Sequence, residues 1–194
     1  MKAPKKLQDI IQASIDVKQQ LLRDEGCMAA LEQIVPLLVQ CFRAGGKVLW
    51  CGNGGSAADA QHLAAEFSGR FYLDRAPLFS EALHVNSSYL TAVANDYDFT
   101  EVYARLVRAK GQAGDVLIGL STSGNSPNIV KALAQAQQQS LTTIAWTGAK
   151  GGQVIPFADV VCAIPSTDTP RIQEAHLLMG HAVCELVEHI LFTP

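Results

Sequence analysis

Apolar positions recur at helical spacing through the first 45 residues of the chain. They lie three or four residues apart, as on one face of a helix. The first series is Leu7, Ile10, Ile11, Ile15, Leu21 and Leu22, and the second is Leu31, Ile34, Leu37, Leu38 and Phe42. This pattern predicts two amphipathic helices, the second of which ends at Gly45 and Gly46.

After residue 46, short apolar runs alternate with helical patterns. The apolar runs cover residues 47–51, 79–85, 116–120, 142–146 and 160–164, and the helical patterns cover 57–67, 88–94, 101–109, 127–139 and 171–191. Short runs that are apolar throughout are typical of parallel strands buried on both faces. The alternation predicts an α/β fold, a three-layer αβα sandwich around a doubly wound parallel sheet of about five strands.

We expect one domain over residues 1–194, because a chain of this length builds one sizeable core and is short for two. Residues 1–45 form its N-terminal helical segment and residues 46–194 its α/β core. The two N-terminal helices precede the first strand, so they cannot be crossover connections. Their apolar faces must be buried elsewhere, and helix pairing between subunits would bury them.

Charge and hydropathy narrow the range of partners. The net charge is −3, whereas binding to a nucleic-acid backbone needs clustered Lys and Arg in excess. Polar residues interrupt the segment from Leu7 to Val17, and the apolar stretches fall short of the roughly 18 residues that span a bilayer. We therefore expect a soluble, cytoplasmic protein that binds neither nucleic acid nor membrane.

The five cysteines are widely separated and never form a Cys-x-x-Cys pair, which indicates reduced thiols. Cys51 directly precedes a glycine-rich loop. It is either a catalytic thiol or a small buried strand residue, and we favour the second interpretation.

The glycine-rich loop Gly52-Asn53-Gly54-Gly55-Ser56 lies between the first predicted strand and a helical pattern. Glycine lets the backbone approach a ligand, and a helix N-terminus presents N–H groups to negative charge. The loop also fits the dinucleotide pattern G-x-G-x-x-A, but the second predicted strand does not close on the acidic residue that this pattern requires. No Gly-Lys-Ser/Thr follows, so the loop is not a P-loop.

A hydroxyl-rich loop, Ser121-Thr122-Ser123-Gly124-Asn125-Ser126, follows the third predicted strand and precedes a helix that begins at Pro127. Neutral donors and the helix dipole can hold a phosphate without lysine. Alternatively, Ser126 caps the helix and the other residues form a polar turn. Capping explains one hydroxyl but not four in six residues, so we favour phosphate binding.

Two further groups of polar residues could contact a sugar. Asn95 and Asp96, before Tyr97, can bond hydroxyl groups, although such residues are common wherever helices stop. His62 and Glu66 lie four apart on the helix after the glycine-rich loop, and so share one face. They are either a pair of solvent-exposed side chains or the wall of a pocket, where a carboxylate and an imidazole suit proton transfer.

The last predicted helix carries Gln173 and His181, which lie eight residues apart, with a rise of roughly 12 Å. Either Gln173 precedes regular helix and bends back, or one site draws on two subunits. His176 and His189 fall on other faces, and we interpret both as structural or solvent-facing. Two imidazoles with a carboxylate and an amide give only a weak indication of zinc, because glutamine is a rare zinc ligand.

Together these residues resemble the sugar isomerase (SIS) domain family, and within it the branch of isomerases that act on sedoheptulose 7-phosphate. The resemblance covers nearly the whole chain. Its strongest parts are residues 51–62, 95–97, 114–119, 121–126 and 171–174. It implies an aldose–ketose isomerase without an organic cofactor that forms D-glycero-D-manno-heptose 7-phosphate for lipopolysaccharide or related heptose precursors. It also implies a homotetramer with active sites at subunit interfaces.

The resemblance assigns roles to particular residues. Glu66 and His181 would be the acid/base pair. One zinc ion per subunit would be held by His62, Glu66, Gln173 and His181. The substrate contacts would be Asn53, Gly54, Gly55, Glu66, Asn95, Asp96, Ser121, Thr122, Ser123, Ser126 and Gln173.

The sequence departs from the family pattern at residues 85–89, Val-Asn-Ser-Ser-Tyr, where the family often has a Thr-Asp-Thr-Ser-type stretch. This difference affects the expected substrate preference rather than the fold. The family also contains a non-enzymatic tetramer that associates with the bacterial replication initiator. That branch lacks the Glu and the His found here as Glu66 and His181, so we favour the enzyme.

Overall fold

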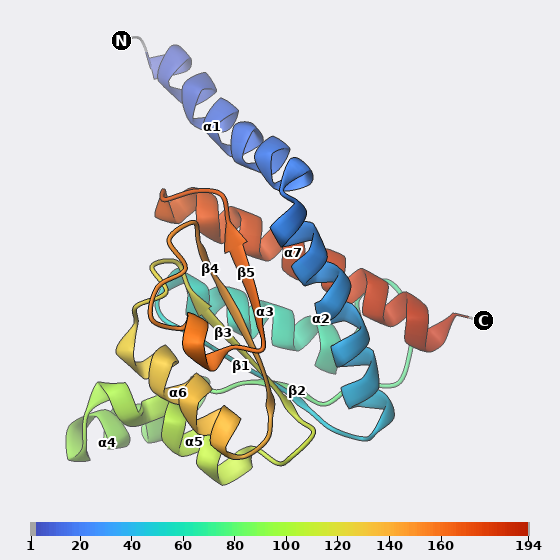
Figure 1. The fold of residues 1–194 in the computed structure, drawn as a ribbon, viewed down its shortest axis with the longest axis vertical. Coiled ribbons are helices and arrows are strands. Elements are labelled where there is room, and N and C mark those ends of the chain that lie inside the picture. Colours follow the sequence, from blue (N-terminus) through green and yellow to red (C-terminus); the bar gives the residue numbers. More distant parts are fainter. Residues whose placement is uncertain (1–2, 194) are drawn as a thin grey trace.

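The computed structural model describes residues 3–193, with five parallel strands between two layers of helices (Figure 1). The helices are α1 (Ala3–Arg23), α2 (Glu25–Arg43), α3 (Gly55–Ser68), α4 (Ser87–Asp96), α5 (Val102–Lys110), α6 (Pro127–Gln138) and α7 (Thr169–Phe192). Short 3₁₀ turns, η1 (Phe99–Glu101) and η2 (Ile155–Phe157), precede α5 and β5. The strands are β1 (Val48–Gly52), β2 (Ser80–Ala82), β3 (Val116–Ser121), β4 (Thr142–Gly148) and β5 (Val160–Ile164).

The strand order is β2-β1-β3-β4-β5, and all neighbouring strands are parallel. Val48 of β1 pairs with Ser80 of β2 on one side and with Val116 of β3 on the other. The predicted α/β class and the five-stranded parallel sheet are therefore confirmed.

Both faces of the sheet are covered by helices. Side chains alternate between the faces of a strand, so Val48 and Trp50 of β1 join a core with α2, α3 and α7. Leu49 and Cys51 join a second core with α4, α5 and α6. Every residue of β1 and β3 is buried, which explains why these strands are apolar throughout.

The second strand is shorter than predicted. The apolar run over residues 79–85 predicted a full strand, but only Ser80–Ala82 belong to β2. Phe79 and Val85 are 59% and 51% exposed. β2 lies at the edge of the sheet and pairs with β1 alone, so the chain bends away after three residues.

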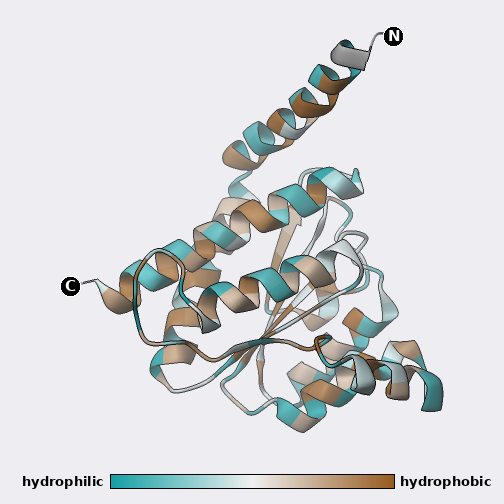
Figure 2. Cartoon of the chain, turned by 180° about the vertical axis from the view of Figure 1, so that it is seen from behind, coloured by the Kyte–Doolittle hydropathy of each residue, from teal (hydrophilic) through white to brown (hydrophobic). Residues whose placement is uncertain are grey.

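The two N-terminal helices differ in how they bury their apolar faces. α2 packs on α7 and β5 and buries Ile34, Leu38 and Cys41 within the same chain, so pairing between subunits is not needed to cover it. α1 projects from the sandwich, and apolar positions recur along it (Figures 1 and 2). Leu21, near its C-terminal end, is buried in the core. The exposed apolar residues of α1 are Leu7, Ile10, Ile11, Ile15 and Leu22, at 41–76% exposure.

Two helices, α2 and α7, are long and apolar enough by composition to cross a membrane. This is weak support for a membrane segment, because the core helices of soluble proteins pass the same test. Both helices pack their apolar faces against the sheet.

His176 of α7 is fully buried beneath β4. Its Nε2 atom lies 3.3 Å from the carbonyl oxygen of Thr147, and its ring centroid lies 5.9 Å from that of Trp146. Burial lowers the pKa of His176 to about 4, although the Thr147 carbonyl acts in the opposite direction. His189 is exposed, so the structural and solvent-facing interpretations of these two histidines are confirmed.

We expect His176 to make the free energy of unfolding pH-dependent. The unfolded chain takes up a proton near the ordinary pKa of about 6.5, whereas folded His176 does so only near 4. Stability is therefore lost as the pH falls through this window, by up to about 3 kcal/mol. Urea unfolding of His176→Gln at pH 7 and pH 4.5 should show a smaller loss than the wild type. His189→Gln should keep the wild-type difference; equal losses in all three proteins would contradict the assignment.

Candidate active site

The two polar loops identified in the sequence follow adjacent strands. The sheet order changes direction between β1 and β3: β1 is followed by α3 on one face, and β3 by α6 on the other. In such sheets, ligands bind beyond the carboxyl ends of the strands at this switch point. Gly52–Ser56 and Ser121–Ser126 both lie there.

A pair of amides joins the two loops. The side-chain nitrogen of Asn53 donates to Oδ1 of Asn128 at 2.9 Å, and the nitrogen of Asn128 donates to Oδ1 of Asn53 at 2.8 Å. Asn128 is 2% exposed and also accepts the backbone N–H of Ile129. Asn128 could not be predicted as a partner of this loop, since an amide in the first turn of a helix has no distinctive spacing from a residue 75 positions away.

The hydroxyl groups of the second loop do not cap the N-terminus of α6. Ser126 occupies the N-cap position of α6, but within residues 3–193 its side chain makes no capping bond. Its Oγ instead lies 3.0 Å from Oγ of buried Ser121. Ser123 is exposed, and its hydroxyl accepts the N–H of Asn125. The capping alternative for the Ser126 hydroxyl is therefore wrong.

Part of this loop lines a polar cavity of about 230 Å³. Its lining residues are Thr122, Ser123, Asn125, Gly148, Ala149, Lys150, Ser166, Thr167 and Thr169. Lys150 adds a basic side chain that was not predicted for this site. It follows β4, and it lies beside Ser123 only because β3 and β4 pair in the sheet. An anion in this cavity would therefore lie among hydroxyl-bearing residues and one lysine.

Asn95 and Asp96 lie in the last turn of α4 rather than in a loop, and both are exposed. The Asn95 side chain donates to Oδ1 of Asp96 at 2.9 Å. Tyr97 follows Asp96, and its ring centroid lies 4.0 Å from the guanidinium carbon of Arg105. These residues belong to the layer of α4, α5 and α6, on the opposite side of the sheet from α3 and α7.

A cluster of two imidazoles and a carboxylate lies between α3 and α7. Nε2 of His62 lies 2.9 Å from Nε2 of His181 and 3.1 Å from Oε1 of Glu66. The side chains of His62 and Glu66 are 47% and 22% exposed. Gly180 brings the two helices together, because a Cβ atom there would lie 2.4 Å from the Leu63 side chain. Close packing at Gly180 and Leu63 thus places the adjacent histidines in contact.

Gln173 lies inside regular helix, since α7 begins at Thr169, so the proposal that it precedes the helix and bends back is wrong. Its amide lies against Gly55, where a Cβ atom would be only 2.6 Å from the amide nitrogen. Gly55 precedes His62 by seven residues, or roughly 10 Å along α3. The structure therefore groups His62, Glu66 and His181, with Gln173 beside the glycine-rich loop.

Comparison with known proteins identifies the family. Residues 12–148 match the SIS domain. The chain belongs to the SIS domain family. It is 49% identical to a phosphoheptose isomerase of Mycobacterium bovis over 96% of this chain and 95% of the relative, and 48% identical to one of Clostridium acetobutylicum over 94% and 93%.

Solved structures of SIS proteins share the fold. A phosphoheptose isomerase from Neisseria gonorrhoeae superimposes with a TM-score of 0.90 at 40% identity, covering 96% of this chain and 99% of that one. Another from Francisella tularensis gives a TM-score of 0.92 at 33% identity, over 97% and 100% of the chains. The likeness therefore extends over both the N-terminal helices and the α/β core of this SIS protein.

The His62, Glu66 and His181 side chains of this SIS protein fit a divalent metal ion. Their ligand atoms lie within 4.8 Å of one another, and a His₂Glu set is a known zinc combination. Nε2 of His62 faces both an imidazole nitrogen and a carboxylate oxygen, and it carries at most one proton to share between these two acceptors. A cation between the three atoms would satisfy all of them.

Cys51 has no chemical part in this arrangement. It is fully buried in β1, and burial raises the pKa of its thiol. A protonated, inaccessible thiol is a poor nucleophile. The interpretation of Cys51 as a buried strand residue is confirmed.

Proposed function

We propose that this chain is a phosphoheptose isomerase, an aldose–ketose isomerase that converts D-sedoheptulose 7-phosphate to D-glycero-D-manno-heptose 7-phosphate. The observation that carries the proposal is the contact of His62 with both Glu66 and His181, in a chain that matches phosphoheptose isomerases over 96% of its length. We assign it to the cytoplasm and to the synthesis of heptose precursors, such as those of lipopolysaccharide.

The proposed chemistry is a proton transfer between neighbouring carbons. Glu66 takes a proton from the carbon beside the carbonyl, giving an enediol-like intermediate, and His181 exchanges protons with the two oxygens. Oε1 of Glu66 faces His62, which leaves Oε2 for the substrate proton. One carbon is reduced as its neighbour is oxidised, so the reaction needs no external oxidant and no organic cofactor.

The other polar residues would hold the substrate. Ser121, Thr122, Ser123 and Ser126 are proposed to bind the phosphate, with Lys150 of the same cavity adding a positive charge. The remaining contacts are proposed for Asn53, Gly54, Gly55, Asn95, Asp96 and Gln173. The Asn53–Asn128 amide pair supports this assignment because it holds the two loops together.

We infer a homotetramer whose active sites lie between subunits. In one chain, Ser123 lines the cavity at the strand ends, whereas Glu66 lies on the flank of α3 beside α7. Parts of two subunits would bring these groups to one substrate. The exposed apolar face of α1 supports association, because Leu7, Ile10 and Ile11 lie on a helix that projects from its own chain.

Sedimentation velocity should give a particle of four 20.8 kDa chains. Ile11→Glu should dissociate it without loss of helical signal, because a charge would be buried in an apolar contact. Gln12→Glu, at an exposed position of the same helix, is the matched control and should stay tetrameric. An Ile11→Glu protein of unchanged mass would contradict the role of α1.

Zinc is the proposed metal, with one ion per subunit held by His62, Glu66 and His181 and with Gln173 as the fourth ligand. When bound, it would polarise the substrate carbonyl as a Lewis acid. The convergence of three ligand atoms supports the first three positions. Gln173 would have to extend from Gly55 toward the cluster.

The function is tested with Glu66→Gln, which keeps the size of the side chain and removes its basicity. We expect kcat for sedoheptulose 7-phosphate to fall about 10²- to 10⁴-fold, while KM changes little. Product analysis by NMR measures the conversion. Glu185→Gln, exposed on α7, is the control and should be fully active. An active Glu66→Gln protein would exclude Glu66 as the base, and an inactive wild type would exclude the function.

Zinc binding is measured by competition with a chromogenic chelator after removal of metal. The wild type should bind about one ion per chain. His62→Ala and His181→Ala should each weaken binding by at least about 100-fold, because loss of a ligand costs more than loss of a residue that only supports one. His189→Ala, exposed at the end of α7, should bind as the wild type does. Equal binding by all four proteins would place any zinc elsewhere.

The non-enzymatic alternative, association with the bacterial replication initiator, is not favoured. The curated relatives at 48–49% identity carry the name of the isomerase. The Glu and His positions that the initiator-associated branch lacks are occupied here, and their side chains are in one cluster.

A further inference from the structure

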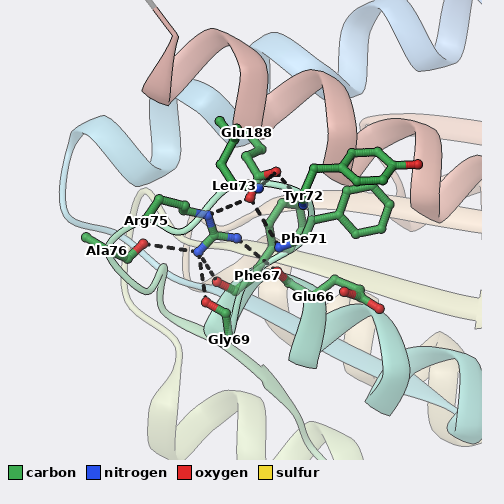
Figure 3. A network of polar contacts seen from close by, with 9 residues as sticks. All are labelled: Glu66, Phe67, Gly69, Phe71, Tyr72, Leu73, Arg75, Ala76 and Glu188. Atoms are coloured by element: carbon green, nitrogen blue, oxygen red, sulfur yellow. Dashed lines mark hydrogen bonds and ion pairs between the residues drawn. The ribbon is translucent and has the colours of Figure 1, made fainter.

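A buried ion pair lies at the end of the helix that carries Glu66 (Figure 3). Nε of Arg75 lies 3.0 Å from Oε1 of Glu188, and the two side chains are 3% and 2% exposed. Arg75 belongs to the segment between α3 and β2, and Glu188 to the last part of α7. The pair therefore connects α3, α7 and the segment that leaves α3.

Arg75 caps the C-terminal end of α3. Its guanidinium nitrogens donate to the carbonyl oxygens of Glu66 at 2.9 Å, Phe67 at 2.7 Å and Gly69 at 3.3 Å (Figure 3). The last carbonyls of a helix have no partner within the helix, and a cation there is favourable. The backbone of the proposed base, Glu66, is thus held directly by Arg75.

Glu188 holds the segment that follows α3. Its carboxylate accepts the N–H groups of Phe71 at 3.2 Å, Tyr72 at 2.8 Å and Leu73 at 3.0 Å. Burial acts to raise the pKa of Glu188, but the three amides and Arg75 together outweigh burial and lower the pKa below its ordinary value. The carboxyl group is therefore charged. The Phe71 ring lies 5.7 Å from the ring of His181. Glu188 follows His181 by seven residues, two turns along the same face of α7.

Stability alone is a poor explanation for this pair. Taking two charges out of water is costly, and apolar residues of similar volume often stabilise a fold equally well. A guanidinium, by contrast, fixes several oxygens in a planar geometry. The oxygens fixed here belong to α3 at Glu66 and to α7 at Glu188, the two helices on which the cluster is built.

We propose that Arg75 and Glu188 are positioning residues, which fix Glu66 and His181 relative to each other. Arg75 sets the end of α3, and Glu188 sets Phe71 against His181. The inference rests on the proposed function for its kinetic consequence, but the geometry that it describes does not depend on the substrate. A misplacement of about 1 Å in such a site can cost about 100-fold in rate.

The test uses Arg75→Met and Glu188→Gln, with Asp115→Asn as the matched control. Asp115 is also a buried carboxylate, 4% exposed, that pairs with a basic side chain, Lys47, at 2.6 Å. It likewise accepts backbone N–H groups, those of Lys47 and Gln112. It precedes β3, at the opposite end of the strand from the Ser121 loop. All three variants should lose stability, whereas only the first two should disturb the cluster.

Two measurements on folded protein decide the proposal. In Arg75→Met and Glu188→Gln, kcat should fall about 10- to 100-fold with KM within about twofold, as for other supporting residues of active sites; Asp115→Asn should keep the wild-type kcat. The side-chain ¹⁵N signals of His62 and His181 should shift in the first two variants and not in Asp115→Asn, with His84 as an internal reference.

The NMR measurement separates this proposal from the function. If the wild type shows no isomerase activity but the His62 and His181 signals shift as expected, the positioning role holds and the proposed reaction fails. If those signals stay in place in Arg75→Met and Glu188→Gln, and the variants lose only stability, as Asp115→Asn does, the pair is structural and the proposal is wrong.

Discussion

Parallel strands that are buried on both faces need helices on both sides, and this constraint determines where the polar loops lie. β1 and β3 expose no side chain, so α3 covers one face after β1 and α6 covers the other after β3. α3 and α6 therefore begin at adjacent strand ends and run along opposite faces of the sheet. The loops that precede them are left together at one edge, where the Asn53–Asn128 amide pair joins them.

The packing of α3 against α7 is the second requirement for the site. Both helices belong to the same core layer, and the absence of a side chain at Gly180 lets Leu63 approach α7. His62, Glu66 and His181 meet on the accessible flank of this contact. At the far end of α3, Arg75 and Glu188 join the same two helices by charge-assisted hydrogen bonds. The cluster therefore lies between a close apolar contact and a buried ion pair.

The two halves of the site use different chemistry because they are built on different parts of the fold. At the strand ends, Ser and Thr residues and Lys150 line a polar cavity, which is the proposed phosphate site. On the helix flank, His62 lies at hydrogen-bond distance from Glu66 and His181, and imidazole and carboxylate groups are the ones proposed to move protons. The exposed apolar face of α1 offers a surface through which several chains could combine these halves.

Most helices and strands of this protein can be predicted from local patterns in the sequence. Apolar runs and helical spacing identified the five strands, and glycine, serine and histidine at strand ends and helix faces identified most candidate site residues. Spacing along one element was enough for the His62–Glu66 pair, because positions four apart in a helix are always neighbours. The short extent of β2 was not predictable, since its edge position depends on the strand order.

Contacts between residues far apart in the chain depend on how the whole protein folds. His181 contacts His62 across 119 positions, Asn128 pairs with Asn53 across 75, and Arg75 pairs with Glu188 across 113. The structure also shows that α2 buries its apolar face in its own chain, whereas most apolar side chains of α1 are exposed. Local patterns report the preference of each segment for a helix or strand, whereas contacts between segments depend on how the whole core packs.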